Sequence, residues 1–539
     1  MMFYLPYILL IMGFSVGCII FFKNKASTFN NRLLSSLIPP TLSIIILIPL
    51  IAVFYAPLWS YTACKFTQVI AFLYDYKVYY GPYSGPIQET IYPPGFIVSF
   101  IPSVIFSTPT KFLAACGILN VLYILLPIVI IFSYLHKKNV CSRSMTILFI
   151  LSTFAIFHIT PTLATILMNP HADAPAICFG ILACFAVFEI KPKENLSIKR
   201  MLLSSLFFSM SFWTKQVEFF LILALLIYVL LLYGWHQMLR YLTFMFSASA
   251  IVSLFFFITF GVDNMLFNII IIPYSHPLRW GLSEGIKNFS SAFLYRTMFF
   301  LLPASFLFVI KNRANFKIKN LLKNNTYLIF LLAWFFLLPS GYLSYSKVGG
   351  YANSYHSLAY LVIAFMILNL YLMEFSIHNW KKFFYVLCIL LVFPCCMVFM
   401  DTKNIYLVYE KFKFNPQEEA YEYIKKNPNS DEIYFPWKTL AVLMASKKLY
   451  HFEYAVKDRE LAGFKPSMIH INQHVPKNMK YIASKFEGYL RFEKRSRDYF
   501  YELTKQLKIN NMVSFFPEFK TTTSIKELPG WTIISKEGF

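Results

Sequence analysis

Acidic residues are scarce in the first 400 positions of this 539-residue chain, so each is a candidate for chemistry. Asp75 lies in the segment LYDYKVYYG, and Asp173 lies in NPHADAP. Lys215 and Gln216 interrupt a long apolar stretch, and Lys347 lies in SKVGGYANSY. Ionisable groups at membrane depth are costly and are usually functional or paired. Such residues could supply a carboxylate that accepts a proton, a second carboxylate that orients a substrate, and cations that hold a phosphate.

Further polar residues in the same segments are candidates for binding a substrate. They are Glu89, Tyr92, His171 and Asn353. Two adjacent glycines before Asn353 would let the backbone approach a ligand closely. Asp75 and Asp173 are therefore the candidate catalytic residues, and the others are candidates for substrate contacts.

Each of these residues also has an ordinary structural interpretation. Asp75 fits a turn residue in a tyrosine-rich loop, and this interpretation weighs about as much as catalysis. Asp173 fits the N-cap of the following helix, which is the stronger single-residue interpretation. Lys215 fits a side chain that extends from a helix end to the membrane interface, and Lys347 fits a tight turn. The shared placement of these residues on one side of the membrane favours the functional interpretation of the set as a whole.

Composition places these residues in a membrane protein. The chain is 58% hydrophobic and 14% charged, whereas a soluble protein carries about a quarter charged residues. Apolar runs of about 20 residues can cross the hydrocarbon core. The runs are 4–22, 36–58, 112–134, 145–167, 174–190, 201–214, 217–233, 241–260, 294–310, 326–341, 357–375 and 383–400. The predicted fold is an all-α polytopic membrane protein with about 11–13 transmembrane helices.

The net charge of +23 indicates membrane orientation and not a nucleic-acid partner. Lys and Arg concentrate in alternate short loops between the apolar runs, which is typical of loops on the cytoplasmic side. The remaining loops then face outward, and so does the C-terminal tail. Most of the loop length lies on that outer face, where function tends to reside. The predicted location is the cell membrane, as a multi-pass protein of the bacterial inner-membrane type.

The chain divides into a transmembrane domain, residues 1–400, and an extracytoplasmic domain, residues 401–539. The first outer loop, residues 60–111, is far longer than usual and contains an apolar, proline-rich segment at 92–107 that suits a helix on the interface. The tail has the composition of a small mixed α/β domain. Its expected elements are a short buried strand at 431–437 and helices at 417–426 and 439–448. Cysteine and histidine spacing suggests no metal site.

In these features the chain resembles the GT-C type glycosyltransferases, of the bacterial glycosyltransferase 39 and RgtA-D-like kind. The resemblance rests on Asp75 in a long first outer loop followed by the sequence YPPG at 92–95. It continues with Asp173 in the second outer loop, the Lys215–Gln216 pair and a late GG…N element at 349–353. An outward C-terminal domain completes it. Each motif is short, so the resemblance rests on the order of the motifs along the chain and on their shared placement on the outer side of the membrane.

The resemblance implies an inverting glycosyltransferase. A sugar would pass from a polyprenyl-phosphate donor to a lipid-linked or cell-envelope glycan acceptor on the extracytoplasmic face. Asp75 would be the general base, Asp173 would shape the site, and Lys215 and Lys347 would contact the donor phosphate. Tyr76 follows Asp75 where many relatives carry a second acid, which places the protein-O-mannosyltransferase branch in doubt. The implied partners are the bilayer, the lipid-linked donor and the glycan acceptor. No cofactor is implied, and the need for a divalent metal is left open.

Three other interpretations are compatible with the sequence. A transporter or flippase would favour charges near the bilayer middle and an internal repeat, neither of which is evident. A multi-span polysaccharide polymerase also uses a large outer loop but typically lacks a soluble tail of this size. A non-catalytic membrane scaffold is the third.

Overall fold

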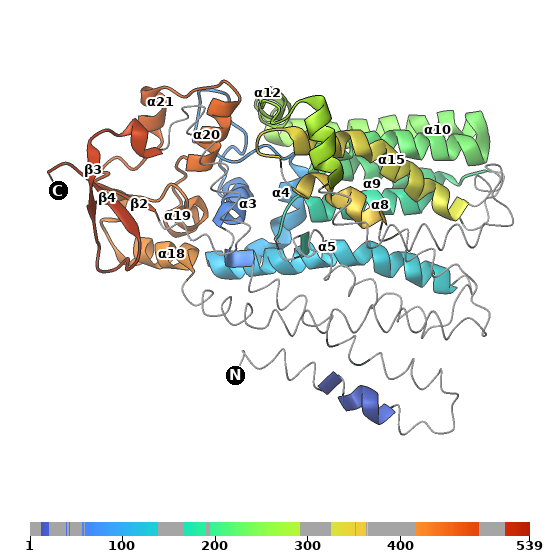
Figure 1. The fold of residues 1–539 in the computed structure, drawn as a ribbon, viewed down its shortest axis with the longest axis horizontal. Helices are drawn as coiled ribbons and strands as arrows, with labels where there is room; N and C mark the ends of the chain where they lie inside the picture. Colours follow the sequence, from blue (N-terminus) through green and yellow to red (C-terminus); the bar gives the residue numbers. More distant parts are fainter. Residues whose placement is uncertain are drawn as a thin grey trace.

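A computed structural model describes most of the chain. The described residues are 56–137 except 59, 169–189, 195–291, 325–350, 352–362, 415–484 and 512–538, with a few isolated positions elsewhere. This part is mostly helical and carries a small mixed sheet near the C-terminus (Figure 1). The predicted runs 4–22, 36–58, 145–167, 294–310, 357–375 and 383–400 lie wholly or largely outside the described residues.

Three helical segments of the described chain are long and apolar enough to cross a membrane. They are Pro109–Lys137, Gln216–Phe260 and Leu328–Ser346. The first is helix α5 (Pro109–Lys137), and the third belongs to α15 (Asn325–Ser346). The predictions of apolar helices at 112–134 and 326–341 are therefore confirmed. The second and third segments pack against each other, and all three extend along the long direction of the view in Figure 1.

The second long segment consists of two helices that meet at Gly234. Helix α10 (Leu221–Phe260) leaves helical geometry at this glycine, where φ is 80° and ψ is 176°. A residue with a side chain rarely adopts that conformation, so glycine makes the break possible at little cost. The predicted runs 217–233 and 241–260 fall on either side of the break.

Two shorter helices, α8 (Asp173–Val187) and α9 (Ile198–Thr214), pack against each other and link α5 to α10. Small residues in α8 let the backbones approach closely. Ser204 and Ser211 of α9 donate hydrogen bonds of 2.8 Å to carbonyl oxygens of α8. With 15 residues, α8 rises about 22 Å, which is less than the thickness of a bilayer core.

The segment 60–111, predicted above as the first outer loop and called by that name below, folds into helical pieces. Helix α3 (Ser60–Leu73) comes first, and α4 (Gly95–Phe100) continues directly into the turn η3 (Ile101–Ile105). The predicted apolar helix within 92–107 is thereby confirmed. Gly95 is required because a Cβ atom there would lie 2.5 Å from the carbonyl oxygen of Trp213. The start of α4 therefore lies directly on the end of α9, beside Lys215.

The C-terminal unit, residues 415–484 and 512–538, contains a four-stranded sheet in the order β1-β2-β4-β3. The strands are β1 (Ile433–Tyr434), β2 (Tyr481–Ser484), β3 (Phe519–Thr523) and β4 (Thr532–Lys536). The β1–β2 pair is parallel, and the others are antiparallel. The helices are α18 (Pro416–Lys426), α19 (Thr439–Ser446), α20 (Glu453–Leu461) and α21 (Met468–Gln473). The predicted mixed character and the helices at 417–426 and 439–448 are confirmed, whereas the predicted strand shortens to two residues.

Short segments complete the described chain. They are η2 (Ala56–Leu58), η4 (Gln216–Phe220), α11 (Val262–Leu266), η5 (Phe267–Ile271), α12 (Ile272–Ser275), η6 (Ala352–Tyr355), η8 (Ser430–Glu432) and η9 (Met512–Phe515).

The C-terminal unit packs on the first outer loop, at one end of the long helices (Figure 1). Helix α19 lies against α3, and one buried core includes side chains from both. Hydrogen bonds reinforce this packing. The Phe452 amide donates to the Ile87 carbonyl at 2.9 Å, and the Arg459 guanidinium donates to the Gly81 carbonyl at 2.9 Å. The first outer loop and the C-terminal unit therefore form one continuous structure.

Candidate functional site

Asp173 lies at the centre of a buried group of charged and polar side chains. It is the first residue of α8, and only 1% of its surface is exposed. One carboxylate oxygen accepts a hydrogen bond from the Lys215 ammonium group. The other lies 2.5 Å from Nδ1 of His171 and 3.5 Å from Nδ1 of His356. A cation and two imidazoles therefore surround one buried carboxylate.

His171 connects this carboxylate to the first outer loop. Its Nε2 atom lies 2.7 Å from Nζ of Lys65 in α3 and 3.0 Å from the hydroxyl oxygen of Tyr92. Tyr92 is fixed in turn, because the Tyr79 hydroxyl donates to its carbonyl oxygen at 2.8 Å. We call Lys65, Tyr92, His171, Asp173 and Lys215 the Asp173 cluster.

Lys215 is positioned by a break between two helices. α9 ends at Thr214, and Lys215 itself has an extended backbone before the η4 turn begins. Its Nζ atom donates a second hydrogen bond, of 2.9 Å, to the carbonyl oxygen of Asn353. The side chain is 4% exposed. A buried ammonium group is tolerated because it is paired and hydrogen-bonded in this way.

Burial shifts the proton affinities of the loop-side groups. Burial and, to a smaller extent, the nearby Lys65 charge lower the pKa of His171 to about 4. Burial also lowers the pKa of Lys65 to about 8, although the carboxylates of Glu89 and Asp173 oppose that shift. The pKa of Tyr92 rises well above its usual value because the ring is buried and lies near those carboxylates. His171 is therefore a neutral imidazole at pH 7, and Tyr92 keeps its proton.

Two more buried carboxyl groups face Lys65. Glu89, in the first outer loop, is 3% exposed, and its charge acts on both Lys65 and Tyr92. Asp458, in α20 of the C-terminal unit, also acts on both groups. Its Oδ1 atom lies 3.3 Å from Nε2 of His276, and burial raises its pKa. The C-terminal unit therefore contributes a carboxyl group to the surroundings of the cluster.

Other predicted residues lie outside the cluster. The Gln216 amide donates to the carbonyl oxygens of Ile91 at 3.0 Å and Ile269 at 3.2 Å, so it joins two loops. The Lys347 ammonium group donates to the Pro273 carbonyl oxygen at 2.6 Å. Asn353 reaches the cluster through its backbone carbonyl, which binds Lys215.

Asp75 is exposed at the end of α3 and makes none of the described contacts of the cluster. Its φ angle is 60°, in the left-handed region that non-glycine residues seldom occupy. Aspartate tolerates this region better than most residues. A residue in the left-handed conformation is common directly after a helix. The geometry suits a residue that ends α3. The catalytic role of Asp75 remains a prediction.

Two of the structural interpretations are wrong. Asp173 does not cap α8, because Ala172 occupies the N-cap position and the carboxylate contacts Lys215 and His171 instead. Lys215 does not extend to an interface, because its ammonium group is buried against Asp173 and Asn353. The tight-turn interpretation of Lys347 holds, since the Gly350 amide donates to its carbonyl oxygen at 2.9 Å.

Sequence reasoning missed Lys65, His356 and Asp458. Lys65 had a recognisable signal, because it is a lone cation in the otherwise uncharged segment 60–74. His356 and Asp458 had none, since they approach the cluster from far along the chain. Among the described residues, no group of three or more His, Cys, Asp or Glu side chains is arranged to hold a metal ion.

Comparison with known proteins found no match, either to a protein-family model or to a curated protein.

Proposed function

We propose that the chain is a polytopic membrane glycosyltransferase of the GT-C type, and that the Asp173 cluster is its active site. It transfers a sugar from a polyprenyl-phosphate donor to a glycan or glycolipid acceptor on the extracytoplasmic face, with inversion at the anomeric carbon. The observation that carries this proposal is the convergence of two lysines, a neutral histidine and a carboxylate in one buried cluster.

The two lysines suit the phosphate end of the donor. Lys65 and Lys215 lie on opposite sides of the His171–Asp173 pair. A phosphate leaving group carries its charge on oxygen, and it needs charge stabilisation more than it needs a proton. A phosphate next to Lys65 would also favour the charged ammonium form, which burial otherwise disfavours.

The histidine suits the acceptor end. Asp173 fixes the Nδ1 side of the His171 ring, so Nε2 is the atom that can accept a proton. Nε2 now contacts Lys65 and Tyr92, and a donor phosphate that engages Lys65 would release its lone pair for the acceptor hydroxyl. The acceptor hydroxyl oxygen would attack the anomeric carbon, the bond to the phosphate oxygen would break, and the hydroxyl proton would pass to Nε2. A bound phosphate would raise the proton affinity of the ring by offsetting the Lys65 charge. Asp173 thereby orients the base, as the acidic member of a catalytic triad does.

The surroundings suit a lipid-linked donor. The three apolar segments that can cross a membrane adjoin the cluster in different ways. Asn120 of α5 accepts a hydrogen bond of 3.3 Å from the His171 amide, and Lys215 directly precedes the second segment. The η6 turn, whose Asn353 carbonyl binds Lys215, packs against α15. An isoprenoid tail could remain in the bilayer while its sugar phosphate reaches the loop. The C-terminal unit lies on the loop that supplies Lys65 and Tyr92, which suits a role in accepting the glycan.

The test is sugar transfer by the purified protein in liposomes with a panel of polyprenyl-phosphate sugars. We expect release of polyprenyl phosphate from at least one donor. Lys65→Met should lower kcat/KM for that donor by about 100-fold, the usual effect of removing one charge-stabilising donor. Lys448→Met, the same substitution at an exposed lysine of the C-terminal unit, should stay near the wild-type value. Equal activity of both variants would refute the assignment of the site.

A further inference from the structure

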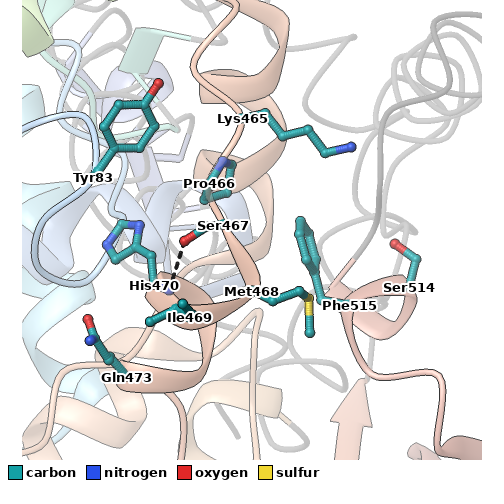
Figure 2. A pocket seen from close by; sticks show the side chains of 10 residues that line it. All are labelled: Tyr83, Lys465, Pro466, Ser467, Met468, Ile469, His470, Gln473, Ser514 and Phe515. Carbon is teal, nitrogen blue, oxygen red and sulfur yellow. Dashed lines mark hydrogen bonds between the residues drawn. The ribbon is translucent and has the colours of Figure 1, made fainter.

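A cavity on the C-terminal unit lies apart from the Asp173 cluster. Its volume is about 770 Å³, within the usual range of about 300–1,000 Å³ for small-molecule sites. None of the cluster residues lines it. Figure 2 shows the Tyr83 ring on one side of the segment 465–470 and Phe515 with Ser514 on the other. The walls therefore come from the first outer loop and from two separate parts of the C-terminal unit.

Hydrogen bonds fix the wall that contains His470. The His470 amide donates to Oγ of Ser467 at 3.2 Å, which caps α21 (Figure 2). Its Nε2 atom donates to the carbonyl oxygen of Gly85 at 2.8 Å, which ties α21 to the loop beside Tyr83. Gly85 has a φ of 64°, and a Cβ atom there would strike the Tyr80 ring. The loop conformation at this wall therefore depends on glycine.

One atom of this wall is left for a ligand. With Nε2 protonated, Nδ1 of His470 is an acceptor, and it is buried with no hydrogen-bond partner among the described residues. The whole side chain is 3% exposed. Burial lowers the pKa of His470, so the ring stays neutral and keeps this lone pair. Buried polar atoms are nearly always paired, so this acceptor calls for a donor such as a water molecule or a ligand hydroxyl.

The chemistry of the lining is that of saccharide recognition. Aromatic rings, Tyr83 and Phe515, can pack against the apolar face of a sugar ring. The Gln473 amide and two serine hydroxyls can donate to and accept from sugar hydroxyls. Lys465 is the cation of the lining, and no carboxylate stands among the described residues that form it. A ligand with one negative charge therefore fits better than a neutral or cationic one.

We propose that this cavity binds a saccharide unit that carries a phosphate or carboxylate group, as the docking site for the acceptor glycan. The identification of that glycan as the acceptor rests on the proposed function. Lys465 pairs with the anionic group, Tyr83 packs against the sugar ring, and Nδ1 of His470 accepts a hydrogen bond from a sugar hydroxyl. The cavity would hold the acceptor chain while its growing end reaches the Asp173 cluster.

The test is ligand-observed NMR titration of the full-length protein in detergent with glucose 6-phosphate as the probe. We expect saturable binding that weakens at least tenfold in Lys465→Ala and in Tyr83→Ala. Tyr83 is 61% exposed, so its removal should leave the fold intact. Lys477→Ala, at an exposed lysine outside the cavity, is the matched control and should bind like the wild type. Absence of saturable binding, or equal binding by all these proteins, would overturn the proposal.

Glucose and inorganic phosphate distinguish a saccharide site from an anion site. Each should bind at least tenfold more weakly than glucose 6-phosphate. Phosphate that binds as tightly as the sugar phosphate would overturn the saccharide assignment. The binding assay with Asp173→Asn separates this proposal from the proposed function, because the cavity should bind the probe whether or not sugar transfer occurs.

Discussion

Asp173 and Asp75 are the two carboxylates that the sequence marks for catalysis, and the structure places them in opposite environments. Asp173 is buried and contacts Lys215, His171 and His356. Asp75 is exposed at the end of α3, in a left-handed backbone conformation. A carboxylate can be kept buried only if charged or polar partners offset its desolvation. The difference indicates that Asp173 holds a buried polar cluster together, whereas Asp75 ends a helix.

Among the substitutions considered for stability, removal of Lys215 should lower the free energy of unfolding the most. Lys215→Met leaves the Asp173 carboxylate buried without its cation, which should lower the free energy of unfolding by about 3–5 kcal/mol. Chemical unfolding in detergent, followed by tryptophan fluorescence, measures this loss. The double variant Asp173→Asn/Lys215→Met removes both charges and should recover most of the stability. A loss below about 1 kcal/mol in the single variant would show that the pair is not buried as described.

Acid should weaken the fold through buried histidines in two regions. Burial lowers the pKa of His171 to about 4, and burial together with His470 lowers that of His451 to about 3. Unfolding returns both to about 6.5, so the unfolded chain binds more protons below that pH. Stability is therefore complete above pH 6.5 and falls as the pH drops toward 4, by about 1.4 kcal/mol per pH unit for each group.

A substitution at His451 tests this linkage. His451→Gln should flatten the pH dependence between 6.5 and 4, because Gln can still accept the hydrogen bond from the Ile87 amide. His236→Gln, at an exposed histidine of α10, should leave the slope unchanged. Denaturant midpoints at several pH values give both slopes. Identical slopes in wild type and His451→Gln would contradict a buried neutral His451.

Close packing beside the cluster gives an intermediate effect. Gly95→Ala places a methyl group 2.5 Å from the Trp213 carbonyl oxygen, so α4 must move away from α9 and from Lys215. Such overpacking should cost about 1–3 kcal/mol of stability. Gly281→Ala is the matched control, because no atom lies within 4 Å of the added methyl. If the two variants unfold at the same denaturant concentration, the close approach of α4 to α9 is wrong.

The smallest effect is expected at Asp75. Glycine adopts a φ of 60° freely, so Asp75→Gly should change the free energy of unfolding by no more than about 0.5 kcal/mol. Asp75→Val should cost about 1–2 kcal/mol, because a β-branched side chain strains that conformation. The denaturant midpoints of both variants provide the measurement. Equal midpoints would show that Asp75 does not adopt the left-handed conformation.

Local sequence patterns predicted the described helices well. The apolar runs at 112–134 and 326–341 correspond to α5 and α15, and the polar periodicity after residue 415 corresponds to α18. These patterns are local, since each helix satisfies its own backbone hydrogen bonds. The predicted length of the strand at 431–437 was too great, since β1 has only two residues. The length of β1 depends on its pairing with β2, about 50 residues later in the chain.

The site was predictable only in part. Asp173, His171 and Lys215 stood out because polar residues are rare in apolar surroundings. Their partners did not, since Lys65 lies 106 residues before His171 and Asp458 belongs to the C-terminal unit. The sequence gives no distance between such segments, and the resemblance alone ranked Asp75 as the base ahead of Asp173. Burial and pairing, which only the fold reveals, separate the surroundings of the two carboxylates.

The most direct test compares sugar transfer by Asp173→Asn and Asp75→Asn, each normalised to folded protein by tryptophan fluorescence. Polyprenyl phosphate released from the best donor in liposomes is the readout. We predict that Asp173→Asn lowers the rate by at least about 100-fold, because the proton-accepting histidine loses its orienting carboxylate. Asp75→Asn should retain activity within about threefold, since its side chain is exposed. Loss of transfer in Asp75→Asn with retention in Asp173→Asn would contradict the account.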